Sequence, residues 1–147
     1  MLCVISEYDL GYIKKKETVE LLKNIIFSIQ SLPKWNGHLY NWYQIKTKEP
    51  LNPRYVSTVD SGNFVGYLYV VKVFLEELII EGENIEELQN LLEIIENMIS
   101  STDFSVLYNQ EQQIFSIGFD IEENKLTDSY YDLLASEARQ DLLFLII

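Results

Sequence analysis

Hydrophobic residues recur at helical spacing along much of this chain, which predicts a mainly helical fold. Between residues 15 and 31, one apolar face is formed by Val19, Leu22, Ile25, Ile26 and Ile29. Pro33 ends this helix, because proline lacks the N–H that the helix would need. Residues 2–9 have the pattern of the end of a shorter helix, with Gly11 as its C-terminal cap.

Two further helices are predicted in the middle of the chain. Ser57 and Asp60 have the spacing of a capping box, so a helix is expected from there to about residue 81. Another helix is expected over residues 85–100, where apolar residues again recur every three to four positions.

Two stretches between the helices have the aromatic and β-branched composition of hairpins. They cover residues 38–57 and residues 106–119, and the second is expected to turn near residues 109–111. A last helix, capped by Asp128 or Ser129, is expected to run to the end of the chain. The order helix, hairpin, helix therefore occurs twice. This order is typical of an α/α toroid, so the predicted fold is mainly α: an incomplete (α/α)6 toroid with two short β-hairpin excursions.

The charge of the chain excludes several classes of partner. Its formal net charge is −12, which opposes binding to a nucleic-acid backbone or to an anionic membrane surface. Residues 64–80 are the most apolar stretch, but Lys72, Glu76 and Glu77 interrupt it, so a core helix is expected there and not a membrane span. Neutral ligands such as sugars are compatible with this charge.

Residues that hold metals or build nucleophilic triads are scarce. Cys3 is the only cysteine, so neither a disulfide framework nor a cysteine metal site is predicted. His38 is the only histidine. It could be combined with Ser57 and Asp60 as a Ser-His-Asp triad, but triads are recognised by geometry, and we expect none here. The sequence predicts no metal and no cofactor.

Aromatic side chains are dense in the first hairpin stretch, which contains Tyr40, Trp42, Tyr43 and Tyr55 as well as Arg54. Connections are usually short and polar, so a long aromatic one is expected to line a site. Aromatic faces can stack on a sugar ring, and tyrosine hydroxyls can bond to sugar hydroxyls. The alternative is that these rings hold the hairpin against the helices.

Polar residues gather at the start of the next helix, where Asp60, Ser61 and Asn63 occur within four positions. Free backbone N–H groups are present at a helix start, so these side chains are candidates for holding sugar hydroxyls. The alternative is plain N-terminal capping, which favours the same residue types.

A second polar set near the end of the chain consists of Tyr130, Asp132, Glu137 and Arg139. A glycosidase needs two carboxyl groups a set distance apart, and Asp132 and Glu137 fall on different sides of one predicted helix. Asp60 facing either of them would supply such a pair. The alternative is a buried ion-pair network that contains Glu137 and Arg139.

One segment consists of GHLYNWY at residues 37–43 and PRYVSTVDSGN at 53–63, and a second consists of FSIGF at 115–119 and SYYDLLASEAR at 129–139. These two segments resemble the front of the glucoamylase-like module of cyclic β-1,2-glucan synthases. They occur in the same order as in that family. Gln44 stands where such sequences usually carry an aspartate. Both segments end a hairpin excursion and begin the following helix, and alternate helices of a toroid point the same way, so both segments are expected to reach one rim of the barrel.

This resemblance also implies a carbohydrate function, in a parent protein that resembles a glycosyltransferase and transglycosylase. Residues 1–147 would form a single incomplete domain, the N-terminal part of a barrel acting on β-1,2-glucan by glycoside transfer, cyclisation or hydrolysis. The main catalytic acids are expected beyond Ile147, so the chain would supply rim contacts and be inactive alone. Its expected partners are β-glucan or another neutral saccharide and the rest of the parent barrel.

A non-catalytic helical interaction module is the alternative function. The chain ends in an apolar run, residues 142–147, and an uncovered apolar edge would favour self-association. The expected localisation is cytoplasmic, because the N-terminus lacks the pattern of a signal peptide. Membrane association is expected only through parts of the parent outside this chain.

Overall fold

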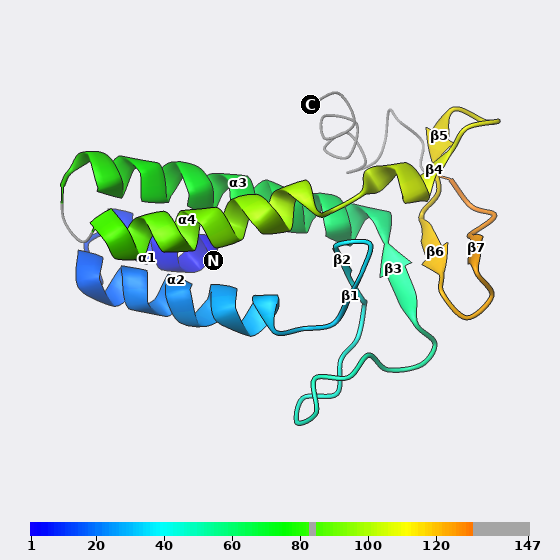
Figure 1. Ribbon diagram of the computed structural model, residues 1–147, viewed down its shortest axis with the longest axis horizontal. Helices are drawn as coiled ribbons and strands as arrows, with labels where there is room; N and C mark the ends of the chain where they lie inside the picture. Colours follow the sequence, from blue (N-terminus) through cyan, green and yellow to red (C-terminus); the bar gives the residue numbers. More distant parts are fainter. Residues whose placement is uncertain (83–84, 131–147) are drawn as a thin grey trace. The chain divides into compact units, whose positions relative to one another are not determined.

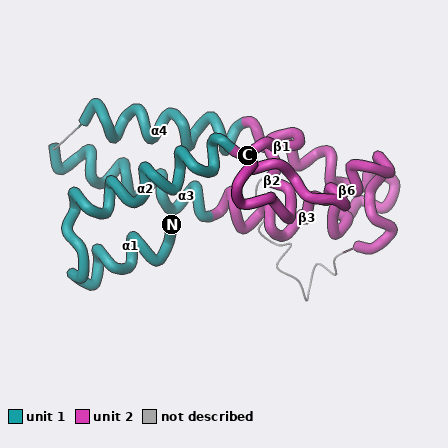
Figure 2. The backbone as a smooth tube through the Cα atoms, turned by 90° about the horizontal axis from the view of Figure 1, so that it is seen from below, with its two compact units in different colours: residues 1–31, 67–100 teal, residues 32–66, 101–147 magenta. Residues whose placement is uncertain are grey.

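The structure is a computed structural model that describes residues 1–82 and 85–130. Four α-helices account for about half of these residues, and short antiparallel strands form small sheets (Figure 1). The chain divides into two compact units, which Figure 2 shows in separate colours. Unit 1 contains Met1–Ser31 and Tyr67–Ser100, and unit 2 contains Leu32–Gly66 and the chain from Ser101 onward.

Unit 1 is built from helices. It contains α1 (Leu2–Asp9), α2 (Lys15–Gln30), α4 (Ile85–Ser100) and, from Tyr67 onward, α3 (Thr58–Ile80). The structure confirms all four of the helices predicted for these regions. Their apolar faces form the core of the unit, which includes Leu22, Ile26, Leu68, Val71, Leu75, Leu78, Leu88, Leu91 and Ile95.

The helices begin and end at the predicted signals. α2 ends at Gln30, shortly before Pro33. Gly11 follows α1 with a φ of +77°, a conformation that favours glycine over residues with a side chain. α3 begins at Thr58, because the Ser57 Oγ accepts a hydrogen bond from the Asp60 N–H at 3.3 Å.

Two short hairpins lie in unit 2. β1 (Lys34–Trp35) pairs with β2 (His38–Leu39), and β4 (Tyr108–Asn109) pairs with β5 (Ile114–Phe115). The second hairpin confirms the turn predicted after residue 109. The first hairpin was predicted over residues 38–57, but it spans residues 34–39. It turns at the Asn36-Gly37 pair, because the φ values of +47° and +83° at these residues suit a two-residue hairpin turn.

A three-stranded antiparallel sheet completes unit 2, in the order β3-β6-β7. β3 (Tyr55–Ser57) pairs with β6 (Gly118–Asp120), and β6 pairs with β7 (Lys125–Leu126). Residues 55–57 therefore pair with a distant part of the chain and not with residues near 38, which corrects the predicted hairpin over 38–57. Strand pairing between distant residues leaves no trace in local composition.

The core of unit 2 is small and aromatic. It contains Phe104 and Leu107 from a 3₁₀-helix (η1, Phe104–Leu107), together with Val56, Phe115 and the buried His38. Trp35 stacks on Phe119 with ring centroids 4.4 Å apart, which joins the first hairpin to the three-stranded sheet. In this way the fold combines helices with small antiparallel sheets.

Two parts of the fold prediction are not decided by these residues. Closure of the helices into a toroid stays a prediction, and the predicted last helix falls within residues 131–147, outside the described residues. Within residues 1–82 and 85–130, no helix is long and apolar enough to cross a membrane.

Candidate functional site

The candidate site is the first turn of α3, which belongs to unit 2. A complete capping box would have the Asp60 carboxylate accept the Ser57 N–H. Instead, the Asn41 Oδ1 accepts that N–H at 3.1 Å, so only half of the predicted box forms. Asp60 is exposed, and its carboxylate has no hydrogen bond or ion pair with another described residue. Asn41 thus leaves this carboxylate available at the helix start.

The two other candidates of this turn differ in exposure. Ser61 is buried, and its hydroxyl donates to the Ser57 carbonyl at 2.8 Å, so it belongs to the framework of the turn. Asn63, which directly follows Gly62 in the helix, is partly exposed. Asp60 and Asn63 are therefore the polar side chains of this turn that a ligand can reach.

The second resembling segment meets the same turn of α3. Thr58 donates its N–H to the Ile117 carbonyl at 3.1 Å and its hydroxyl to the Ser116 carbonyl at 2.7 Å. Ile117 in turn donates its N–H to the Ser129 carbonyl at 2.9 Å, and Ser116 forms an antiparallel bridge with Tyr130. Both segments therefore meet at the start of α3: the first segment contains this turn and also binds it through Asn41, and the second binds it through the Ser116 and Ile117 carbonyls.

Ser116 is the centre of this junction. It is fully buried, and its hydroxyl lies 2.9 Å from the Gly118 carbonyl and 2.7 Å from the Thr127 carbonyl. Thr58 is also fully buried. Hydrogen bonds between buried groups are costly to lose, because an unpaired buried group has no water to replace its partner. The junction is therefore expected to hold the candidate site in one arrangement.

Two of the candidate tyrosines hold the backbone in place. The Tyr43 hydroxyl donates to the Pro33 carbonyl at 2.7 Å and accepts the Tyr40 N–H at 2.9 Å. The Tyr40 and Tyr43 rings meet edge to face with centroids 6.1 Å apart. Burial raises the pKa of the Tyr43 phenol, which keeps it protonated as a donor. This arrangement agrees with the structural interpretation of Tyr43.

Tyr55 and Tyr130 also have protein partners. The Tyr55 hydroxyl lies 3.1 Å from the Thr127 Oγ1, and its ring covers Gly118 so closely that a Cβ there would collide with it. The Tyr130 hydroxyl accepts a hydrogen bond from the Asn109 Nδ2 at 2.9 Å. Both tyrosines are only partly buried.

Trp42 differs from these tyrosines because half of it, 50%, is exposed. It stands at the base of a tight loop, residues 42–51, which we call the tongue. The Trp42 carbonyl accepts the Leu51 N–H at 3.0 Å, and Tyr43 forms an antiparallel bridge with Pro50. Trp42 directly follows Asn41, whose side chain binds the first turn of α3. The residue that carries this exposed indole therefore follows directly, in the sequence, a residue that contacts the candidate site.

Gln44 shapes the tongue. Its Oε1 accepts the N–H groups of Lys46 and Thr47 at 2.6 and 2.7 Å, and its own N–H donates to the Glu49 carbonyl at 2.8 Å. A side-chain oxygen that accepts backbone N–H groups in a turn is also what an aspartate supplies. The glutamine therefore retains an acceptor suited to this turn.

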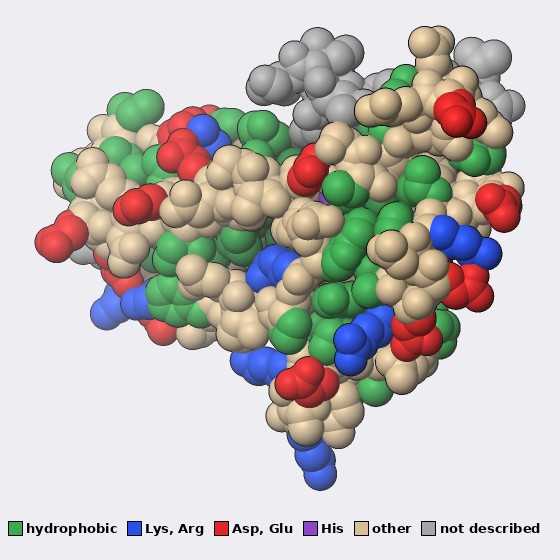
Figure 3. All heavy atoms as spheres, turned by 45° about the vertical axis from the view of Figure 1, so that its right-hand side comes forward, with side chains coloured by type: hydrophobic (Ala, Val, Ile, Leu, Met, Phe, Trp, Pro, Cys, Tyr) green, Lys and Arg blue, Asp and Glu red, His purple; other side chains and the backbone are tan. Residues whose placement is uncertain are grey.

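Arg54 is exposed in the loop that leads into β3. Its carbonyl accepts the Ile121 N–H at 3.0 Å, which fixes the backbone beside the sheet and leaves the guanidinium group at the surface. On the face of the molecule drawn in Figure 3, hydrophobic side chains are interspersed with acidic and basic ones. Such a mixed surface offers both stacking and hydrogen-bonding groups to a neutral ligand.

His38 is not part of this site. It is fully buried, its Nε2–H donates to the Asp103 carbonyl at 2.9 Å, and its ring meets Phe104 edge to face. Burial lowers its pKa, so the imidazole is neutral at pH 7. The described residues contain no group of histidine, cysteine and carboxylate side chains able to hold a metal ion. Asp132, Glu137 and Arg139 lie outside the described residues.

Sequence reasoning missed three residues that build the site. Asn41 and Thr58 lie in the first resembling segment, and Ser116 lies in the second. Their polar side chains gave no local reason to expect long-range partners. Only Asn41 had a usable signal, because an asparagine between two aromatic residues is unlikely to be there for packing.

Comparison with known proteins adds one relative. No family model matches the chain. Over 77 residues, 52% of the chain, the sequence is 44% identical to the cyclic beta-(1,2)-glucan synthase NdvB of Rhizobium meliloti (strain 1021). The match covers 3% of that protein's length. The chain is thus related over half its length to a cyclic β-(1,2)-glucan synthase, which confirms the predicted relation. The assignment to its glucoamylase-like module stays a prediction.

Proposed function

We propose that this chain supplies saccharide contacts in a carbohydrate-active module that acts on β-1,2-glucan. One observation supports the proposal: the second resembling segment is joined by hydrogen bonds to the first turn of α3, which belongs to the first segment, because Thr58 donates to the Ser116 and Ile117 carbonyls. The relative is named as a synthase of cyclic β-(1,2)-glucan, which supports this class of ligand. The module is the front of a glucoamylase-like helical barrel, and the chain is one part of it.

The chemistry of the exposed groups suits a neutral sugar. The Trp42 indole offers an apolar face to the C–H face of a pyranose ring, and it is half exposed. The Asp60 carboxylate and the Asn63 amide offer acceptors and donors to hydroxyl groups. The acidic charge of the chain, −12, opposes anionic ligands but leaves uncharged saccharides unaffected.

The proposed role is binding and not bond cleavage. A glycosidase needs two carboxyl groups placed on either side of the scissile bond. Asp60 is the one carboxylate among the candidate residues that the structure describes. In this proposal the chain positions the glucan, and the hydrolysis or transfer step uses acids from the remainder of the module.

Tryptophan fluorescence tests the proposal. The chain has two tryptophans, of which Trp35 is stacked on Phe119 and Trp42 is half exposed. In a Trp35→Phe background, the emission therefore reports on Trp42 alone. Titration with β-1,2-linked glucose oligomers is expected to change this emission with saturation, whereas uncharged polyethylene glycol at equal concentration is not.

Variants make the same test specific. Trp42→Ala is expected to weaken binding, measured by calorimetry, by about tenfold or more, and Asp60→Asn by less. Trp42→Phe keeps an aromatic face and is the matched control. Equal affinity of Trp42→Ala and the unmodified protein, or no binding at millimolar oligomer, contradicts the proposal. Release of shorter glucans by the chain alone contradicts the assignment of a binding role without cleavage.

A further inference from the structure

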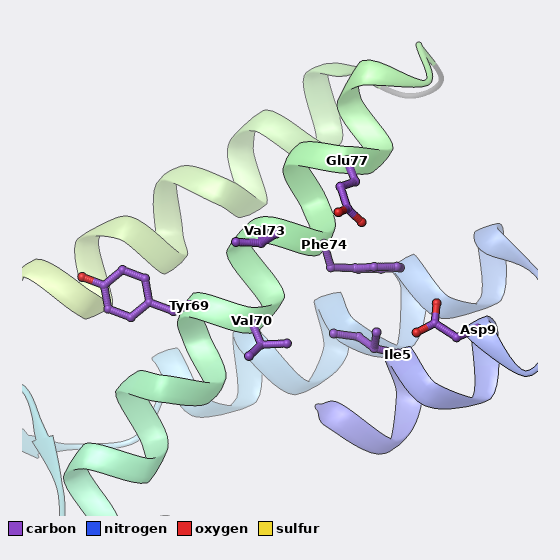
Figure 4. A pocket seen from close by; sticks show the side chains of 7 residues that line it. All are labelled: Ile5, Asp9, Tyr69, Val70, Val73, Phe74 and Glu77. Carbon is purple, nitrogen blue, oxygen red and sulfur yellow. The ribbon is translucent and has the colours of Figure 1, made fainter. Parts of the chain in front are cut away.

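A groove of about 390 Å³ lies between α1 and α3 in unit 1 (Figure 4). Its apolar lining consists of Ile5 from α1 and Val70, Val73 and Phe74 from α3. Ile5 and Phe74 are buried and form the base, whereas Val70 and Val73 are 46% and 52% exposed. The groove is therefore an apolar surface that is open to solvent.

The character of α3 explains why the groove exists. α3 buries Leu68, Val71 and Leu75 in the core of unit 1, yet its other face also carries the apolar Val70 and Val73. A helix that is apolar on all sides is usually covered on all sides. An exposed apolar face on such a helix is a common mark of an interaction surface.

One end of the groove is acidic. Glu77 lies two helical turns after Tyr69 along α3, and the Asp9 carboxylate from α1 lies toward the Glu77 end in Figure 4. Neither carboxylate forms an ion pair with a lysine or arginine of the described chain. A partner that covers the valines and places a cation beside Asp9 and Glu77 would complement both features.

We propose that this groove binds an amphipathic helix of another polypeptide, with a lysine or arginine next to its apolar anchors. The α3 residues Val70, Val73, Phe74 and Glu77 have the i, i+3, i+4, i+7 spacing of a helical contact face. A second copy of this chain is the less suitable occupant, because its net charge of −12 and its own acidic groove would repel. The inference concerns unit 1 and does not depend on the saccharide function.

Two synthetic peptides test this partner chemistry. Both are fluorescein-labelled amphipathic helices with leucine at positions i, i+3 and i+4, one with lysine and the other with glutamate at i+7. Fluorescence anisotropy with the full chain is expected to show binding of the lysine peptide at least about tenfold tighter than of the glutamate peptide. Added salt is expected to reduce this difference. Equal affinities, or no binding of either peptide, overturn the proposal.

Variants of the protein locate the binding. Val73→Asp is expected to abolish peptide binding, and because Val73 is half exposed, the helical content is expected to stay unchanged by circular dichroism. The double variant D9N/E77Q is expected to remove the preference for the lysine peptide. The matched control E86Q/E93Q removes two exposed carboxylates of α4 and is expected to keep it.

Analytical ultracentrifugation of the chain without peptide tests whether the groove is occupied by a second copy of the chain and not by another polypeptide. The proposal expects a monomer for both the unmodified protein and Val73→Asp. Self-association that Val73→Asp abolishes would assign the groove to a second copy and overturn the proposal.

Discussion

The two units of this protein are stabilised by different interactions. Unit 1 buries apolar side chains at helical spacing, with its charged groups near the surface. Ion pairs among its described residues include those of Lys15 with Glu81, Lys23 with Glu87 and Lys72 with both Glu76 and Glu96. Among the described residues, unit 1 buries the polar Thr18, whereas unit 2 buries several polar side chains: Thr58, His38 and Ser116 are fully buried, and each binds a backbone carbonyl.

This difference has a consequence for how each unit tolerates change. Apolar packing accepts substitutions that preserve volume and pattern. A buried hydrogen bond depends on one donor and one acceptor, and its loss leaves a group without a partner. We therefore expect conservative substitutions to affect unit 2 more than unit 1. Both tryptophans lie in unit 2, so fluorescence reports on it, while far-ultraviolet circular dichroism reports mainly on the helices.

The largest effect is expected for Gly37→Ala. Gly37 has a φ of +83°, and a Cβ on it would collide with the backbone of Ser101 and Thr102. Backbone atoms cannot move aside as a flexible side chain can. We expect a loss of roughly 3 kcal/mol or more in the unfolding free energy of unit 2, measured by urea denaturation with tryptophan fluorescence.

Gly82→Ala is the matched control for this substitution. Gly82 has a similar φ of +88°, but nothing lies within 4 Å of an added Cβ. Because Gly82 lies in unit 1, its effect is followed by circular dichroism, and its cost is expected to be that of the left-handed backbone alone, about 1 kcal/mol. Equal losses of unfolding free energy for the two variants would contradict the close contact between Gly37 and the Ser101 backbone.

A smaller effect is expected for Thr58→Val. This substitution keeps the shape of the side chain and removes the hydroxyl that donates to the Ser116 carbonyl at 2.7 Å. The unfolding free energy of unit 2 is expected to fall by about 1–3 kcal/mol, because a buried carbonyl loses its partner. Thr58→Ser retains the donor and is expected to recover most of the loss. A valine variant as stable as the serine variant contradicts the proposed junction.

The stability of unit 2 is also expected to depend on pH through His38. Burial lowers the pKa of this imidazole below its ordinary value of 6.5, so the unfolded chain binds the proton more readily than the folded one. The contribution of neutral His38 is complete above pH 6.5 and decreases as the pH falls below it.

His38→Gln supplies the comparison, because its amide nitrogen can donate to the Asp103 carbonyl but does not titrate. Urea denaturation at about pH 7.5 and about pH 5 is expected to show a larger loss for the unmodified protein than for the variant. The carboxylates contribute equally to both proteins, so the difference isolates His38. The same pH dependence in both proteins would contradict a buried neutral histidine.

The smallest effect is expected for Lys72→Met in unit 1. Lys72 forms an ion pair with Glu96 at 2.7 Å, and the glutamate side chain is about half exposed. Exposed ion pairs contribute less than about 1 kcal/mol, and salt screens them. Circular dichroism during thermal unfolding is expected to show a small decrease in midpoint that disappears at high salt. A decrease as large as that of Thr58→Val would remove the contrast between the units.

Sequence reasoning succeeded where structure is local. Helical spacing and the capping residue Ser57 predicted the four helices to within about one residue, because both signals act within a few positions. The turn of the second hairpin was predicted for the same reason, although of the predicted range 106–119, residues 106–107 belong to η1 and residues 118–119 to β6. The Asn36-Gly37 turn was local too and had a recognisable signature, so the misplaced first hairpin was avoidable.

Other features depend on residues that are distant in sequence. β3 pairs Tyr55 with Asp120, and Asn41 takes the place that Asp60 would have in a capping box. No spacing rule connects these positions. For the same reason, the sequence could nominate Trp42 and Tyr130 as site residues but could not separate the exposed indole from the tyrosines that hold the backbone.

Chemical-shift mapping by nuclear magnetic resonance tests the central claim most directly. An isotope-labelled chain is titrated with β-1,2-linked glucose oligomers, and the backbone amides are followed. Our account predicts that amides of both segments, such as Trp42, Asp60 and Tyr130, shift together with one saturation curve, since both segments meet at the start of α3. Shifts confined to one segment, or to the helices of unit 1, would contradict it.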